Sequence, residues 1–158
     1  MTPPFPAVVF DLDGTLTSPG TTRPAPGVPA LVEALHARGV PLAVATSAGT
    51  ATARRVLDDL GVLGCFTSVA GRGADGVLAG KDAVVGEALL GLGLPSAPPG
   101  AVLVGDAPAD LEAARAHGLV PVGVAWGGAR ADVLRDAGAR AVLERPDELW
   151  ALSGHEAS

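Results

Sequence analysis

Two aspartates that stand one residue apart carry the clearest chemical signal in this sequence. Asp11 and Asp13 belong to the string Asp-Leu-Asp-Gly-Thr-Leu, which directly follows the apolar run 7–10. A carboxylate can attack phosphorus and form an aspartyl-phosphate, which divides a slow hydrolysis into two easier steps. A second carboxyl can protonate the leaving oxygen and later deprotonate the attacking water. The pair therefore favours phosphoryl chemistry over the alternative that both acids are solvated loop residues.

A second pair of acids follows another apolar run. Asp106 comes just beyond the run 101–104, and Asp110 falls in the expected first turn of the next helix. Asp110 could serve only as a partner of the helix dipole, whereas no local propensity demands an acid at position 106. Carboxylates that must meet an anionic substrate need a cation between them, and oxygen ligands suit Mg²⁺. We therefore expect magnesium as the cofactor.

Two hydroxyls and a lysine are candidates for binding phosphate. Thr46 and Ser47 follow the apolar run 40–45, just before a predicted helix, where hydroxyls and free amides form an anion site. The alternative is that Ser47 or Thr50 merely caps this helix, although the position of Thr46 at a strand end favours phosphate binding. Lys81 is the sole lysine of the chain. Its ammonium suits a site with several anions, against the common alternative of a solvent-exposed lysine.

Strands and helices must bring these candidates together. Strands are predicted at the short apolar runs 7–10, 40–45, 66–70, 101–104 and 120–125. Helices are predicted between them, each ending at a glycine: Gly39, Gly61, Gly93 and Gly118. Segments rich in glycine or proline are predicted loops: 17–27, 71–80 and 94–100.

The alternation of strands and helices predicts the fold class. Strands and helices with short connections imply a parallel sheet with right-handed crossovers, hence a three-layer, doubly wound, Rossmann-like α/β fold. In such sheets the ligand site lies beyond the carboxyl ends of the strands. The candidate acids and hydroxyls all follow predicted strands, so this edge of the sheet is the predicted site.

The length of the chain predicts the number of domains, and its charge bears on the partners to be expected. A chain of 158 residues predicts one domain covering residues 1–158. The formal net charge is −6 and the basic residues are dispersed, so nucleic acid is not an expected partner. The sequence begins without a signal-like segment, and no apolar run approaches the roughly 20 residues that span a bilayer. We therefore expect a cytoplasmic protein without a membrane partner.

Together the candidate positions resemble the motifs of the haloacid dehalogenase-like superfamily, in order and on the expected elements. The matching residues, in the order of the four motifs, are Asp11 with Asp13, then Thr46, then Lys81, then Asp106 with Asp110. The resemblance implies that Asp11 is the nucleophile and Asp13 the general acid/base. It also implies that Thr46 and Lys81 are catalytic residues that bind the transferring phosphoryl group.

The same resemblance implies the metal ligands and the reaction. A carboxylate oxygen of Asp11, the backbone carbonyl of Asp13 and the carboxylate of Asp106 would hold Mg²⁺ with water and substrate phosphate. Asp110 would support the site by orienting Lys81 or a metal-bound water. The implied activity is hydrolysis of a phosphomonoester through an aspartyl-phosphate on Asp11. An acid at position 13 favours a phosphatase over a dehalogenase, because family dehalogenases lack one there.

Segments 110–115 and 123–128 resemble the phosphoglycolate phosphatase-like branch, whose members usually insert a helical cap before the second strand. Here that interval holds a loop and one predicted helix, so a capless core is predicted. Among relatives an open site goes either with a large substrate or with a homo-oligomer whose neighbouring subunit closes the site. The expected partner is a small phosphorylated metabolite or a phosphorylated macromolecule. Arg23 could meet the anionic part of a substrate or be an ordinary surface residue. Trp126 could flank the site or simply pack.

Two other functions stay open at this point. A core that retains the site without turnover could act as a phosphate-sensing or protein-binding module. The missing cap favours that alternative, whereas the intact set of acids and Lys81 disfavours it. Phosphoryl transfer between sugars, as in related mutases, requires a closed cap that excludes water, and it is therefore the least favoured of the three.

Overall fold

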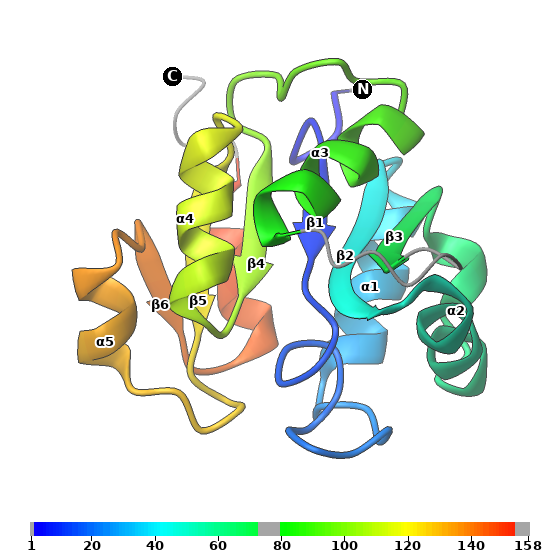
Figure 1. Cartoon of the computed structure of the whole chain (residues 1–158), viewed down its shortest axis with the longest axis horizontal. Helices are drawn as coiled ribbons and strands as arrows, with labels where there is room; N and C mark the ends of the chain where they lie inside the picture. The colour runs from blue at the N-terminus through cyan, green and yellow to red at the C-terminus, as the bar shows by residue number, and fades with distance from the viewer. Residues whose placement is uncertain (1, 73–79, 154–158) are drawn as a thin grey trace.

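The computed structural model describes residues 2–72 and 80–153. One parallel sheet of six strands runs in the order β3-β2-β1-β4-β5-β6 (Figure 1). The strands are β1 (Val8–Phe10), β2 (Leu42–Gly49), β3 (Ser68–Arg72), β4 (Val102–Gly105), β5 (Val120–Val124) and β6 (Ala141–Leu143). The chain moves outward from β1 to β3 and then crosses back to β4 on the other side of β1. The strand order therefore reverses between β1 and β4, where open α/β sheets bind their ligands.

Helices cover both faces of the sheet, which gives the predicted three layers. The helices are α1 (Val28–Ala37), α2 (Thr50–Asp59), α3 (Lys81–Gly91), α4 (Pro108–Ala116) and α5 (Ala131–Asp136), with short 3-10 segments η1 (Leu63–Cys65) and η2 (Pro146–Leu152). Figure 1 shows α3 and α4 in front of the sheet and α1 behind it. The doubly wound α/β prediction is confirmed.

The alternation of side chains along β1 divides the core into two parts. Val8 and Phe10 pack on the face that α1, α2 and η2 cover, whereas Val9 faces the layer formed by α3 and α4. The layer with α3 and α4 is rich in alanine, whereas the opposite layer holds the larger aromatic rings. In that layer Phe10 and Phe66 meet edge to face, with their ring centroids 6.2 Å apart.

The structure corrects three details of the predicted elements. The strand expected at 40–45 runs instead from Leu42 to Gly49, so Thr46 lies within it and not beyond its end. The sixth strand, β6, and the helix before it, α5, are absent from the prediction. The apolar run at β6 covers only three residues between two charged ones, and the six residues of α5 are too few for a clear helical period. The predicted loop 71–80 begins later than expected, because β3 extends to Arg72, and residues 73–79 lie outside the described residues.

No cap domain is inserted in the described part of the chain. The interval between Asp13 and β2 contains a loop and α1, and the described part of the interval between β2 and α3 contains α2, η1 and β3. The prediction of a capless core is therefore confirmed. Within residues 2–72 and 80–153, no helix combines the length and the apolar character that a membrane crossing requires.

Candidate active site

Parallel register brings the strand ends of the site together. Phe10 of β1 lies opposite Val44 of β2 and Val104 of β4. Asp11, one residue further, is therefore level with Ala45 on one side and with the end of β4 on the other. Asp106 follows directly after β4. The alignment of three central strands thus places Asp11 and Asp106 at one point of the rim, although 95 positions separate them in the sequence.

The ammonium of Lys81 connects these strand ends. Its Nζ lies 2.8 Å from Asp11 Oδ1 and 2.9 Å from Asp110 Oδ1. It also donates a hydrogen bond of 2.8 Å to the carbonyl of Ala45. The side chain is 11% exposed, and that of Asp110 is 3% exposed. The side chain of Lys81 is therefore mostly covered and has three acceptors, and the alternative of a solvent-exposed lysine is wrong.

Burial and the attraction between opposite charges shift the pKa values of the groups that meet here. Burial raises the pKa of Asp11 to about 6, and the attraction of Lys81 offsets part of the rise. Burial likewise raises the pKa of Asp110 to about 6, with repulsion from Asp11 adding to it, and it raises the pKa of Asp106. Burial by itself would lower the pKa of Lys81, but the attraction of Asp11 and Asp110 outweighs it, so that pKa is raised. One ammonium thus faces several carboxylates.

The carboxylates offer a fitting donor set for a divalent cation. Oxygens of Asp11, Asp106 and Asp110 lie within 4.8 Å of one another. Asp110 already uses Oδ1 for Lys81 and Oδ2 to accept the backbone amide of Ala107 at 3.1 Å. Asp11 has given one oxygen to Lys81, and its second oxygen can serve a metal with Asp106. The carboxylates of this cluster outnumber the single ammonium of Lys81, and hard, anionic oxygens of this kind suit Mg²⁺. Asp110, whose two oxygens already have partners, would support the site.

Asp13 lies outside this carboxylate cluster. Its side chain is exposed, and its Oδ1 accepts the backbone amide of Gly20 at 3.1 Å. Gly14 has a φ of 79°, and a Cβ at this position would collide with Oδ2 of Asp106. The backbone therefore turns tightly against Asp106, which glycine alone permits. The Asp13 carbonyl as a metal ligand and the Asp13 carboxyl as general acid/base both stay predictions.

The predicted phosphate-binding hydroxyls lie where β2 meets α2. Thr46 is buried and accepts a backbone amide at 3.1 Å through Oγ1, and Ser47 is exposed. The N-cap of α2 is Gly49, which makes no side-chain cap. The hydroxyl of Thr50 donates instead to the carbonyl of Arg72 at 3.4 Å. The alternative that Ser47 or Thr50 caps this helix is therefore wrong, and the first amides of α2 face the rim without a side-chain cap.

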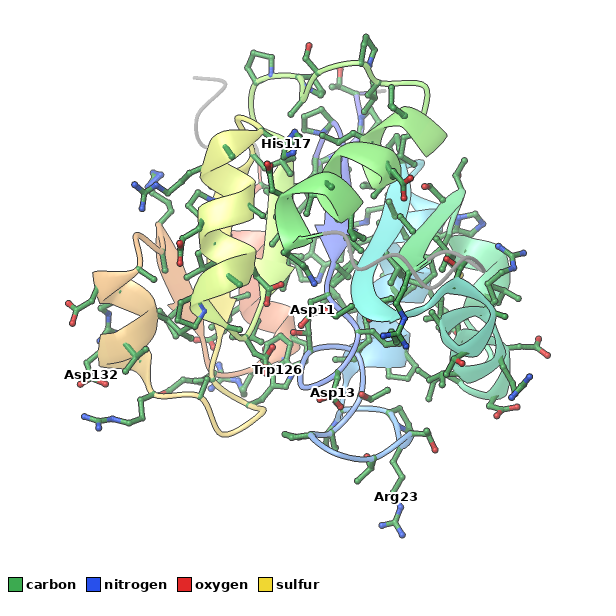
Figure 2. The ribbon with its side chains drawn as sticks, in the orientation of Figure 1. Asp11, Asp13, Arg23, His117, Trp126 and Asp132 are labelled. Carbon is green, nitrogen blue, oxygen red and sulfur yellow. The ribbon has the colours of Figure 1, made fainter. Side chains whose placement is uncertain are left out.

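Arg23 and Trp126 differ in their relation to the site. Figure 2 shows the exposed side chain of Arg23 pointing away from Asp11, so the structure does not bring it to the carboxylate cluster. Trp126 does flank the site, because its indole Nε1 donates to the carbonyl of Thr15 at 2.9 Å. The sequence did not predict the hydrogen bond from Trp126 to Thr15 or the one from Lys81 to the carbonyl of Ala45. Backbone acceptors leave no signal in a sequence, since every residue carries one.

The raised carboxyl pKa values predict that the metal-free protein loses stability as pH rises. The pKa values of Asp11 and Asp110 are about 6 in the folded protein against an ordinary value of 3.8. Between these values the folded state binds more protons than the unfolded state, so the free energy of unfolding falls with rising pH. Thermal unfolding in EDTA should therefore show a higher midpoint at about pH 5 than at about pH 7.5.

The matched control for this pH effect is the double variant Asp11→Asn/Asp110→Asn, which should flatten the dependence. Added Mg²⁺ should raise the midpoint more at the higher pH, because the cation binds ionised carboxylates. A midpoint that climbs with pH in EDTA would contradict the assignment of both raised pKa values.

Comparison with known proteins gives a family and a close relative. The family model described as haloacid dehalogenase-like hydrolase matches residues 18–118. The tyrosine-protein kinase PtkA of Mycobacterium tuberculosis is 41% identical over 108 residues, which cover 68% of this chain and 36% of PtkA. A solved structure of PtkA, 38% identical, aligns with a TM-score of 0.64 over 80% of this chain and 59% of that chain. The match thus spans about a third of the curated relative's length.

Solved phosphatase-like structures share the fold over more of the chain. A putative phosphatase from Clostridium difficile aligns with a TM-score of 0.85 over 94% of this chain and 98% of its own, at 18% identity. A putative phosphoglycolate phosphatase from Lactobacillus delbrueckii subsp. bulgaricus is 26% identical, with a TM-score of 0.71, over 84% of this chain and 54% of its own. These likenesses and the family-model match over residues 18–118 confirm the predicted resemblance, and this chain belongs to the haloacid dehalogenase-like hydrolase family.

Proposed function

We propose that the protein is a magnesium-dependent phosphomonoester hydrolase that works through an aspartyl-phosphate on Asp11. The observation that carries this proposal is the contact of Lys81 with Asp11, Asp110 and the carbonyl of Ala45, all within 2.9 Å. This contact fixes the orientation of the Asp11 carboxylate at the rim of the sheet. A buried carboxylate with a fixed orientation and a neighbouring positive charge is suited to nucleophilic attack on phosphorus.

In the first step, Asp11 attacks the phosphorus and the bond to the leaving oxygen breaks. Asp13 gives its proton to that oxygen, since its exposed carboxyl lies beside the nucleophile on the same turn. Thr46, Ser47 and the first amides of α2 bind the equatorial oxygens, with Lys81 balancing their charge. When bound, Mg²⁺ would supply further neutralisation of the anionic oxygens from the side of Asp11 and Asp106.

In the second step, water attacks the phosphorus of the aspartyl-phosphate. Asp13, now ionised, takes a proton from this water, and the bond between phosphorus and Asp11 breaks to release inorganic phosphate. Asp13 then carries a proton again, and Asp11 is restored as a carboxylate. The same two carboxyl groups thus serve both halves of the cycle.

The open rim bears on the class of substrate. The interval between Asp13 and β2 holds a loop and α1, so a substrate that is larger than a metabolite can approach Asp13. We therefore propose a phosphorylated macromolecule or a small phosphorylated metabolite as substrate. We also propose that, in a homo-oligomer, a neighbouring subunit could close the open site.

Phosphate release by the purified protein tests this function. The protein is incubated with Mg²⁺ and p-nitrophenyl phosphate, phosphorylated metabolites or phosphopeptides, beside matched samples in EDTA. Release that requires Mg²⁺ supports hydrolysis, and the best compound begins to define the substrate. An absence of release from every compound, with Mg²⁺ bound, would reject the hydrolase and favour a non-catalytic phosphate-sensing or protein-binding module.

A second candidate function follows from the relative that is named a tyrosine-protein kinase, at 41% identity. An acceptor hydroxyl could replace water in the second step and leave with the phosphoryl group. The 158 residues contain no tyrosine, so a tyrosine acceptor would have to lie outside them. Incubation with labelled ATP and a tyrosine-containing polypeptide separates the two functions. Label on tyrosine supports transfer, whereas label only in inorganic phosphate supports hydrolysis.

A further inference from the structure

A segment that follows β5 contacts the backbone of the turn that carries the two catalytic acids. We call residues 11–15 the catalytic turn, and Trp126 with Gly127 the β5 clamp. The indole Nε1 of Trp126 donates a hydrogen bond of 2.9 Å to the carbonyl of Thr15, across 111 positions of sequence. Figure 2 shows Trp126 beside the turn that bears Asp11 and Asp13.

Gly127 packs against the same turn through its backbone. A Cβ at position 127 would collide with the carbonyl oxygen of Gly14, and its next nearest contact would be the carbonyl carbon of Gly14 at 3.1 Å. A Cβ on Gly14 itself would collide with the carboxylate of Asp106. The catalytic turn therefore lies between the β5 clamp and Asp106, with no space for a side chain on either side.

The two acids of the turn depend on this contact to different degrees. Asp11 continues the hydrogen-bond ladder through its amide, which donates to Val104 at 2.9 Å, and Lys81 holds its carboxylate at 2.8 Å. Asp13 is exposed, and Gly20 provides its described hydrogen bond at 3.1 Å from a loop. The position of the Asp13 carboxyl thus follows from the backbone of the turn, which the β5 clamp contacts.

We infer that the β5 clamp positions Asp13 for proton transfer, so that Trp126 and Gly127 are positioning residues of the reaction. This inference rests on the proposed function, because it assigns the clamp to the proton-transfer step of that function. A displaced turn would weaken proton donation to the leaving oxygen more than it weakens attack by Asp11. Substitutions in the β5 clamp should therefore lower the rate more for substrates whose leaving oxygen needs a proton. A general loss of folded protein would instead lower the rates for all substrates alike.

Trp126→Phe is the first test, because it keeps an apolar ring and deletes the indole donor. With an alkyl phosphate, whose leaving oxygen needs a proton, kcat/KM should fall by about tenfold or more, which is part of the range for general acid catalysis. With p-nitrophenyl phosphate, whose leaving group needs little protonation, the fall should stay within about threefold. Equal falls for both substrates would overturn the inference.

A double-mutant cycle with Asp13→Asn decides whether the clamp acts through Asp13. If it does, adding Trp126→Phe to Asp13→Asn should cause little further loss of kcat/KM, because the proton donor is already gone. Multiplied losses in the double variant would show an independent effect and would reject the positioning role.

Matched controls exist for both clamp residues. Trp150 lines the same groove of about 650 Å³ as Trp126, but its ring lies against Arg38 at 4.7 Å, so Trp150→Phe should leave both kcat/KM values unchanged. Gly127→Ala should displace the turn and reproduce the effect of Trp126→Phe. Gly64→Ala adds a Cβ that meets nothing within 4 Å and should have no effect. Activity loss in the controls equal to that in the clamp variants would contradict the inference.

NMR separates failure of this inference from failure of the proposed function. If the wild-type protein releases no phosphate, the hydrolase proposal fails, but the clamp is still observable. In Trp126→Phe the amide signals of Gly14 and Gly20 should shift, while in Trp150→Phe they should stay in place. Unchanged signals of both glycines in Trp126→Phe would overturn the inference whatever the activity.

Discussion

Asp11→Asn should lower phosphate release by at least about a thousandfold, because an amide cannot form the acyl-phosphate bond that divides the reaction into two steps. The fold should persist. Asparagine has nearly the shape of aspartate, and its side-chain oxygen can still accept from Lys81, which keeps its contacts with Asp110 and the carbonyl of Ala45. The assay is initial-rate phosphate release with Mg²⁺, on protein with a native circular dichroism spectrum.

The stability of this variant is a second readout from the same sample. Because burial raises the pKa of Asp11 to about 6, its charge is costly to bury in the metal-free protein near neutral pH. The unfolding midpoint in EDTA should therefore equal or exceed that of the wild type. Asp132→Asn is the matched control, since Asp132 pairs with the exposed Arg130 and lies apart from Asp11 in Figure 2. Full activity in Asp11→Asn would refute the nucleophile assignment.

Lys81→Met should cost both activity and stability. The Lys81 side chain is 11% exposed and lies within 2.9 Å of two carboxylates. Removing one partner of a buried ion pair leaves the other charge uncompensated, which typically costs about 3–5 kcal/mol. Urea unfolding at about pH 7.5 in EDTA should show a loss of this order. Phosphate release should fall as well, since the charge that balances the transferring phosphoryl group is gone.

The cause of that instability is testable by neutralising the carboxylates. With Lys81 removed, the attraction that lowers the pKa values of Asp11 and Asp110 disappears, so both carboxyl groups take up protons at higher pH. The folded variant then binds more protons than its unfolded chain, and its stability should recover as pH falls. Adding Asp110→Asn to Lys81→Met should restore part of the loss. Arg130→Met removes an exposed pair and should cost far less. A deficit in Lys81→Met that neither low pH nor Asp110→Asn relieves would point to lost packing instead.

Residue types and strand positions were enough to predict much of this protein. The string that contains Asp11 and Asp13 directly follows a short apolar run, and the carboxyl ends of parallel strands meet at one edge. The same rule predicted that Asp106 belongs to the site, because it also follows an apolar run. The alternation of strands and helices determined the doubly wound fold, because strands buried on both faces and helices with one apolar face differ in their periodicity. The strand β6 was not predicted, because its apolar run covers only three residues between two charged ones, whereas the apolar run at β1 begins one residue before the strand, at position 7.

Contacts between residues that lie far apart in the sequence were decided by the tertiary structure alone. Sequence patterns could not predict that Thr50 would donate to Arg72 of the neighbouring strand, which removes it as a cap. They also could not show that Lys81 would share its ammonium among Asp11, Asp110 and a carbonyl, or that Trp126 would reach Thr15. Local sequence carries side-chain type and periodicity, whereas these contacts depend on strand register and helix placement. The pKa values follow from the same packing, because burial is their main cause and burial belongs to the assembled fold.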